Sequence, residues 1–156
     1  MVCVNHATSG NWRQLETLKK YVEPKHTPGF GARMRTKESS NLEVFMGLAD
    51  SEVGAASNAL GFYRSDGASP GNWKARVKAG GVGTDVDLGI LGDMEEHDFS
   101  VVVSSLEVVF SYDGKTVHVA TSNIPAVLLH FALWIKTTTG AARTLAVDYA
   151  YLTAGR

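Results

Sequence analysis

The residues best suited to chemistry are acidic side chains gathered in one short segment, 85–98. Carboxylate oxygens are ligands that Ca²⁺ prefers, so the segment is a candidate metal site. Its spacing lacks the D-x-D-x-D-G run of an EF-hand loop. We therefore interpret it as an acidic turn in contact with water and predict no metal ion. The acidic residues are Asp85, Asp87, Asp93, Glu95, Glu96 and Asp98.

Basic residues alternate along two expected strands, 30–36 and 73–79, so that they share one face of each. If both faces belong to one sheet, they form a basic strip, with the acidic segment as a separate patch. Such a strip predicts docking on an acidic protein surface or on a second copy of the chain. The alternative, that these are ordinary solvated faces, stays open. The candidate docking face consists of Arg33, Arg35, Lys74, Arg76 and Lys78.

The turn-rich loop 65–72 is the best local candidate for binding a sugar. Such a site needs an exposed aromatic ring for stacking and polar groups beside it, and residues of both kinds flank this loop. Trp73, however, alternates in phase with Ala75 and Val77, which favours a place in the core or at its rim. The candidate glycan loop consists of Tyr63, Asp66 and Trp73.

No other pattern predicts a catalytic centre or a cofactor site. The five histidines are far apart and lack metal-ligand spacing. Cys3 has no matched histidine and aspartate that would activate a thiol. The glycine-rich run 80–83 follows an expected strand, but neither a helix nor a Lys-Ser/Thr pair follows it, as a phosphate-binding loop requires. We therefore predict that the chain is not an enzyme and has no cofactor.

The composition is that of an ordinary globular domain. The chain has 156 residues, 44% hydrophobic and 20% charged, with a net charge of −1. This balance argues against a dedicated nucleic-acid binder, and no apolar run reaches the length of a membrane span. The N-terminal residues lack the pattern of a signal peptide. A single cysteine excludes an intrachain disulfide.

Alternating hydrophobicity predicts that β-strands position these residues. In segment 106–119, two alternating runs meet at Asp113-Gly114, a dipeptide suited to a type I′ turn. Segment 13–23 fits both a helix and a strand, and its neighbours favour a strand. The predicted hairpin pairs are Tyr112 with Lys115, Phe110 with Val117 and Val108 with Val119, with Leu106, Val108, Phe110, Val117 and Val119 on the buried face. Near the C-terminus the alternation predicts one shared face for Leu145, Val147, Tyr149 and Tyr151.

About ten such strands, joined by turns rich in glycine, asparagine, aspartate and serine, predict an all-β antiparallel sandwich. We expect one sandwich domain over residues 13–156, preceded by a flexible arm over residues 1–12. The order of the strands and their residue sequences resemble the concanavalin A-like lectin/glucanase jelly roll of tailed-bacteriophage structural proteins. The segments that carry this resemblance are FGARMRT (30–36), EVFMGLAD (43–50), LGFYRSDG (60–67), NWKARVKAGG (72–81), VVFSYDGKTVHVATSNIP (108–125) and TLAVDYAYL (144–152).

The resemblance implies a non-enzymatic virion protein, such as a capsid decoration or a fibre module, that is made in the host cytoplasm. Its partners would be the major capsid protein, other virion proteins or a second copy, with the arm as a tether. The glucanase branch of this fold carries an E-x-D-x-x-E run, which this sequence lacks. A glycan-binding host-recognition module is the alternative, and a degenerate glucanase-type hydrolase is the third hypothesis. No nucleic-acid or membrane partner is expected.

Overall fold

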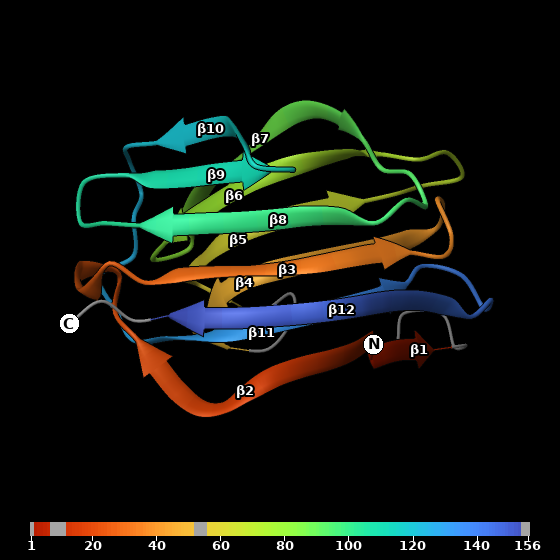
Figure 1. Ribbon diagram of the computed structural model, residues 1–156, viewed down its shortest axis with the longest axis horizontal. Coiled ribbons are helices and arrows are strands. Elements are labelled where there is room, and N and C mark those ends of the chain that lie inside the picture. Colours follow the sequence, from red (N-terminus) through yellow and green to blue (C-terminus); the bar gives the residue numbers. More distant parts are fainter. Residues whose placement is uncertain (1, 7–11, 52–55, 154–156) are drawn as a thin grey trace.

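The computed structural model describes residues 2–6, 12–51 and 56–153, and it shows two β-sheets packed face to face (Figure 1). The strands are β1 (Val2–His6), β2 (Trp12–Val22), β3 (Gly29–Thr36), β4 (Leu42–Ala49), β5 (Ala59–Ser65), β6 (Asn72–Ala79), β7 (Val82–Leu91), β8 (His97–Val103), β9 (Val108–Tyr112), β10 (Lys115–Ala120), β11 (Leu129–Thr137) and β12 (Arg143–Thr153). A short 3-10 turn, Pro24–His26, lies between β2 and β3. The predicted all-β sandwich is confirmed.

Each sheet has six strands, and neighbouring strands are antiparallel throughout. Sheet A has the order β1-β12-β3-β8-β9-β10, and sheet B has the order β2-β11-β4-β5-β6-β7. After β3 in sheet A, the chain forms the β4–β7 meander of sheet B before it returns to sheet A at β8. It returns to sheet B only for β11, which separates β2 from β4. Positions far apart in the sequence thus become neighbours on one sheet face.

The N-terminal residues contribute a strand to each sheet. β2 pairs with β11, which confirms the strand interpretation of segment 13–23. β1 pairs with β12, from Val2 opposite Val147 to His6 opposite Arg143. β1 lies within the segment for which an arm was predicted, while residues 1 and 7–11 fall outside the described part, so the tether stays a prediction. Among the described residues no helix has the length and apolarity needed to cross a bilayer.

The β9–β10 hairpin turns where the sequence predicts. Asp113 and Gly114 have φ values of 48° and 74°, the positive values that a type I′ turn requires. The first predicted pair, Tyr112 with Lys115, is confirmed.

The remaining predicted pairs of this hairpin are wrong, because a β-bulge between Thr116 and His118 shifts the register by one residue. His118 now lies opposite Phe110, and Ala120 lies opposite Val108. Val119, which was predicted on the buried face, is consequently exposed. Leu106, which precedes the hairpin, is also exposed, whereas Val117 packs against the core.

A second bulge changes the faces of β12. Leu145 and Val147 are buried, but the register shifts between Val147 and Tyr149. The extra residue, Asp148, turns the rest of the strand over. Tyr149 and Tyr151 therefore project from the outer face of sheet A, 47% and 41% exposed. The prediction that they share a face with Leu145 is wrong.

Candidate functional site

The outer face of sheet B carries a row of aromatic side chains. The strand register aligns Trp134 on β11, Phe45 on β4 and Tyr63 on β5. Phe45 stacks on Trp134 with 5.9 Å between ring centroids, and Tyr63 lies 6.4 Å from Trp134. Small residues occupy the next two rows on β4 and β5, with Ala132 and His130 beside them on β11. Phe45, Trp134 and the three alanines of these rows are at most 4% exposed and form a second buried hydrophobic cluster. The small residues are Ala132, Gly47, Gly61, Ala49 and Ala59.

Gly47 and Gly61 lie opposite each other on β4 and β5. A Cβ on Gly47 would lie 2.2 Å from the Leu60 carbonyl oxygen and 2.6 Å from Cζ of Phe45. A Cβ on Gly61 would lie 2.2 Å from the Met46 carbonyl oxygen. Because backbone atoms cannot move aside, neither position accepts a side chain without distorting the strand pair. The glycines therefore allow β4 and β5 to pair closely beneath the Phe45 ring.

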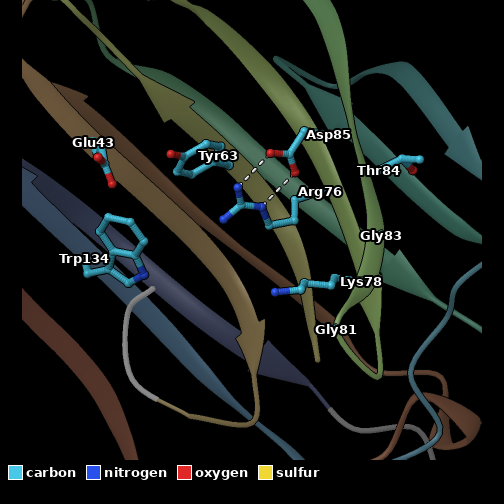
Figure 2. Close-up of a pocket in the computed structure, with 9 residues that line it drawn as sticks. All are labelled: Glu43, Tyr63, Arg76, Lys78, Gly81, Gly83, Thr84, Asp85 and Trp134. Carbon is cyan, nitrogen blue, oxygen red and sulfur yellow. Dashed lines mark hydrogen bonds and ion pairs between the residues drawn. The ribbon is translucent and has the colours of Figure 1, made fainter. Parts of the chain in front are cut away.

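A pocket of about 420 Å³ opens on this face (Figure 2). Its side chains come from β4, β5, β6, β7 and β11. Figure 2 shows Arg76 and Lys78 extending from β6 in the direction of Trp134. The lining residues are Glu43, Tyr63, Arg76, Lys78, Gly81, Gly83, Thr84, Asp85 and Trp134.

Arg76 is the best-fixed polar group of the pocket. Its Nε and Nη2 donate to the two carboxylate oxygens of Asp85 at 2.8 and 2.7 Å. Its guanidinium carbon lies 3.7 Å from the ring centroid of Tyr63, in cation–π geometry. Burial lowers the pKa of Arg76, but the bonds to Asp85 outweigh burial and raise the pKa above its ordinary value. The pocket therefore holds a permanently charged, oriented donor beside an aromatic ring.

Two further polar contacts lie at the pocket. Lys78 donates from Nζ to the Ala56 carbonyl oxygen at 2.8 Å. Glu43 accepts from Lys136 at 3.4 Å. The two carboxylates of the pocket, on Glu43 and Asp85, are thus both paired with cations.

These carboxylates are poorly placed for glycoside hydrolysis. The reaction uses two carboxyl groups roughly 5–9.5 Å apart. β4 and β7 are separated by β5 and β6, which corresponds to about 14 Å between their backbones. Among the described side chains of this face, the arrangement is therefore better suited to holding a ring-shaped polar molecule than to a two-carboxylate mechanism.

The structure divides the candidate docking face between the two sheets. Arg33 and Arg35 lie on β3 in sheet A, whereas Lys74, Arg76 and Lys78 lie on β6 in sheet B. These residues do not form one continuous basic strip, because the two strands belong to different sheets. Nor are the charges segregated, since Arg76 pairs with Asp85 of the acidic segment.

The structure also separates the residues of the candidate glycan loop. Asp66 and Trp73 are 3% and 4% exposed and point into the sandwich. Asp66 accepts hydrogen bonds from Arg64 and from the Gly71 backbone amide, so it closes the loop from within. Tyr63 lies on the outer face and lines the pocket. Alternation along β5 is the reason, because Arg64 faces inward and Tyr63 outward.

Trp134 and Glu43 line the pocket but were not predicted as site residues. A signal was present for Trp134, because it is out of phase with Leu133 and Ile135 on an otherwise apolar strand. The structure places Trp134 on the outer face of sheet B, where it is 4% exposed and packs with Phe45 and Tyr63. Nothing in the sequence indicated that β11 would lie next to β4, which is what brings Trp134 to Tyr63.

The acidic segment forms internal pairs with neighbouring side chains. His97 Nδ1 lies 2.7 Å from Oδ2 of Asp113, and its Nε2 lies 3.1 Å from Oδ1 of Asp93. Arg33 lies 3.3 Å from Glu96 and 3.7 Å from Asp98. Within the described ranges, no group of three or more histidine, cysteine or acidic residues is placed to hold a metal ion.

The His97 contacts predict a pH-dependent stability. Burial lowers the pKa of His97, but the bonds to Asp113 and Asp93 outweigh it and raise the pKa. Protonated His97 therefore stabilises the fold fully below the unfolded pKa of about 6.5, and this contribution is lost as pH rises through the higher folded pKa. We expect the melting temperature of His97→Gln to lie furthest below wild type near pH 5.5 and to approach it near pH 9. The exposed His26→Gln serves as control, and a pH-independent difference for His97→Gln would contradict the assignment.

No protein-family model and no curated protein matches the sequence. Solved structures do match. The apo Crh5 transglycosylase has a TM-score of 0.71 at 13% identity, over 98% of this chain and 72% of that one. An alginate lyase, AlyC3, in complex with dimannuronate has a TM-score of 0.72 at 11% identity, over 97% and 73%. A lichenase from a mouse hindgut metagenome has a TM-score of 0.67 at 13% identity, over 88% and 69%.

The chain has the concanavalin A-like jelly-roll fold. This part of the resemblance is confirmed, whereas nothing in the matched structures indicates a phage origin. The prediction of a non-enzymatic virion protein is contradicted, because the jelly rolls reported above are a transglycosylase, a lyase and a glucanase. At these identities the likeness establishes the fold, and activity has to be argued from the site.

Proposed function

We propose that this protein is a carbohydrate-active protein that holds a glycan chain in the pocket on the outer face of sheet B. The observation that carries the proposal is the pairing of a half-buried aromatic ring, Tyr63, with an oriented donor, Arg76. A pyranose ring has an apolar face of C–H groups and an equatorial rim of hydroxyls. The Tyr63 ring matches the first, and Arg76, Asp85 and Lys78 match the second. Trp134 is 4% exposed and supports Tyr63 from the wall of the pocket.

The surface around the pocket suits a chain rather than a single sugar. The residues that line the pocket come from β11, β4, β5, β6 and β7, which are consecutive strands of sheet B, so the pocket extends across most of the sheet. Cationic and anionic side chains alternate there, with Arg76 next to Asp85 and Lys136 next to Glu43. This balance favours a glycan with many hydroxyl groups over a strongly charged one.

Processing of the bound glycan is the second candidate function. The similar structures include a transglycosylase, a lichenase and an alginate lyase, which act on glycans by different chemistries. Two product assays separate the chemistries, since hydrolysis releases reducing ends and β-elimination leaves an unsaturated product that absorbs ultraviolet light. A panel of mixed-linkage β-glucan, β-1,3-glucan, chitin oligosaccharides and alginate tests binding and turnover together. If the protein binds and converts none of them, the proposal fails for these classes.

Removal of the Tyr63 ring tests the pocket directly. Tyr63→Ala should weaken binding of the best glycan about tenfold, or ~1.4 kcal/mol, because the stacking surface is lost and Arg76 loses its cation–π partner. Isothermal titration measures the change. Tyr63→Phe keeps the ring and should bind within about threefold of wild type. Equal binding by Tyr63→Ala and wild type would remove the pocket from the proposal.

A further inference from the structure

The outer face of sheet A carries a second aromatic surface, on the opposite side of the sandwich from the pocket. Tyr149 and Tyr151 project there because the bulge at Asp148 turns β12 over. Their ring centroids are 6.5 Å apart and their planes differ by 32°. Two exposed tyrosines at alternate positions of one strand thus present adjacent rings that are tilted toward each other.

Both side chains extend along the sheet rather than straight out from it. The Tyr149 hydroxyl donates to Asp98 on β8, although β3 lies between β12 and β8. Its side chain must therefore extend across β3. Tyr151 extends over Gly31 on β3, where a Cβ would lie 2.9 Å from both Cε1 and the hydroxyl oxygen of Tyr151. Glycine at this position leaves the space that the Tyr151 ring occupies.

A line of hydroxyl groups continues from the tyrosines across the sheet. The register places Tyr151 opposite Gly31, Gly31 opposite Ser100 and Ser100 opposite Ser111. Thr116 on β10 follows opposite Ser111. Tyrosine, serine and glycine together form surfaces that combine rigid aromatic area with adaptable hydrogen bonding.

The charges beside the rings disfavour an anionic ligand. Arg33 on β3 lies opposite Tyr149. The carboxylates of Asp98, Glu96 and Asp148 interact electrostatically with Arg33. This local excess of negative charge repels a polyanion. A neutral, hydroxyl-rich chain with apolar ring faces is compatible with the tyrosines, the hydroxyl line and the charge.

We infer that the outer face of sheet A is a second binding site, separate from the pocket, for a neutral polysaccharide that stacks on Tyr149 and Tyr151. Such a surface would hold the protein on an extended polysaccharide while the pocket engages another part of the chain. Two linked contacts raise the overall avidity without new contacts in the pocket. The inference goes beyond the proposed function, because it needs only the residues of sheet A.

Affinity electrophoresis of the full chain through gels containing mixed-linkage β-glucan tests the inference, with alginate gels as the charged comparison. We expect the double variant Tyr149→Ala/Tyr151→Ala to require an about tenfold higher β-glucan concentration in the gel for the same retardation as wild type. Tyr149→Phe/Tyr151→Phe should stay close to wild type, and alginate should retard none of these proteins through this face. Circular dichroism confirms that the variants fold.

Comparison with the pocket variant separates the two proposals. Loss of retardation in Tyr63→Ala but not in Tyr149→Ala/Tyr151→Ala would overturn the second site and support the pocket. Loss of retardation in Tyr149→Ala/Tyr151→Ala but not in Tyr63→Ala would support the second site and overturn the pocket. The Tyr149→Ala/Tyr151→Ala variant could also bind β-glucan as wild type does but sediment as a monomer where wild type is a dimer. That result would show that a second copy covers this face, and it would overturn the inference. Absence of β-glucan retardation in the wild type would overturn it as well.

Discussion

Asp66→Ala will lower the free energy of unfolding by about 3–5 kcal/mol, because it leaves a buried guanidinium without its counter-ion. Arg64 and Asp66 are 1% and 3% exposed. Arg64 donates from Nε at 2.9 Å and from Nη2 at 2.6 Å to Oδ2 of Asp66. Without Asp66, the described residues leave Arg64 a long contact of 3.5 Å from Nη2 to the Thr36 hydroxyl and a position 5.4 Å from the Trp73 ring centroid. Urea unfolding measures the loss.

Asp85→Ala is the matched control, because it removes the same type of partner from another arginine. The side chains of Arg76 and Asp85 are 25% and 32% exposed, so solvent can take over the charges and the cost should stay near 1 kcal/mol or below. Arg64→Met combined with Asp66→Leu should recover most of the stability that Asp66→Ala loses, since both charges are then absent. If the free energy of unfolding of Asp66→Ala lies within about 1 kcal/mol of the wild-type value, the buried ion pair does not contribute the expected stability.

Phe62→Ala will also destabilise the fold by about 3–5 kcal/mol, because it removes an aromatic ring that joins the two sheets. Phe62 is fully buried on β5 of sheet B. Its ring contacts Phe99 and Phe110 of sheet A at centroid distances of 5.1 and 5.4 Å, both nearly perpendicular. The variant therefore loses apolar burial and two favourable edge contacts, and it leaves a cavity between the sheets. Calorimetric melting and urea unfolding measure the effect.

Phe62→Leu should cost less than half as much, because it keeps most of the side-chain volume while losing the ring contacts. Phe45→Ala gives a useful comparison, since Phe45 is equally inaccessible but lies on the outer face of sheet B. A loss below 1 kcal/mol in Phe62→Ala would mean that the two sheets do not depend on this contact.

Arg64 shows how much of the site and core could be predicted from residue types alone. It alternates in phase with Leu60 and Phe62, which places an arginine on a core-facing position, and Asp66 follows at the next position of the same phase. That spacing was a signal for a buried ion pair rather than for a sugar-binding loop. Gly92 could not be foreseen. Its Cβ would lie 2.1 Å from the Arg64 guanidinium, and only the path of the chain between β7 and β8 brings it there.

The bulges mark the limit of pattern analysis within a strand. Alternation correctly predicts the buried positions Leu145 and Val147 of β12, but one extra residue reverses every position after it. The same happens in β10, where the bulge before His118 displaces Val119 from the core. A bulge leaves the composition of a strand unchanged, so its position depends on pairing with the neighbouring strand. The exposure of Tyr149 and Tyr151 could not be predicted for this reason.

The class of the fold, the turn at Asp113-Gly114 and, for most strands, the buried side chains could be read from the residues alone. These are local properties, because turn geometry and alternation depend on residues a few positions apart. That Arg33 and Lys74 lie in different sheets, and that Trp134 packs beside Tyr63, follows from the strand order. The order of strands in a sheet depends on pairings between distant segments, and a strand carries the same alternation whichever neighbour it has.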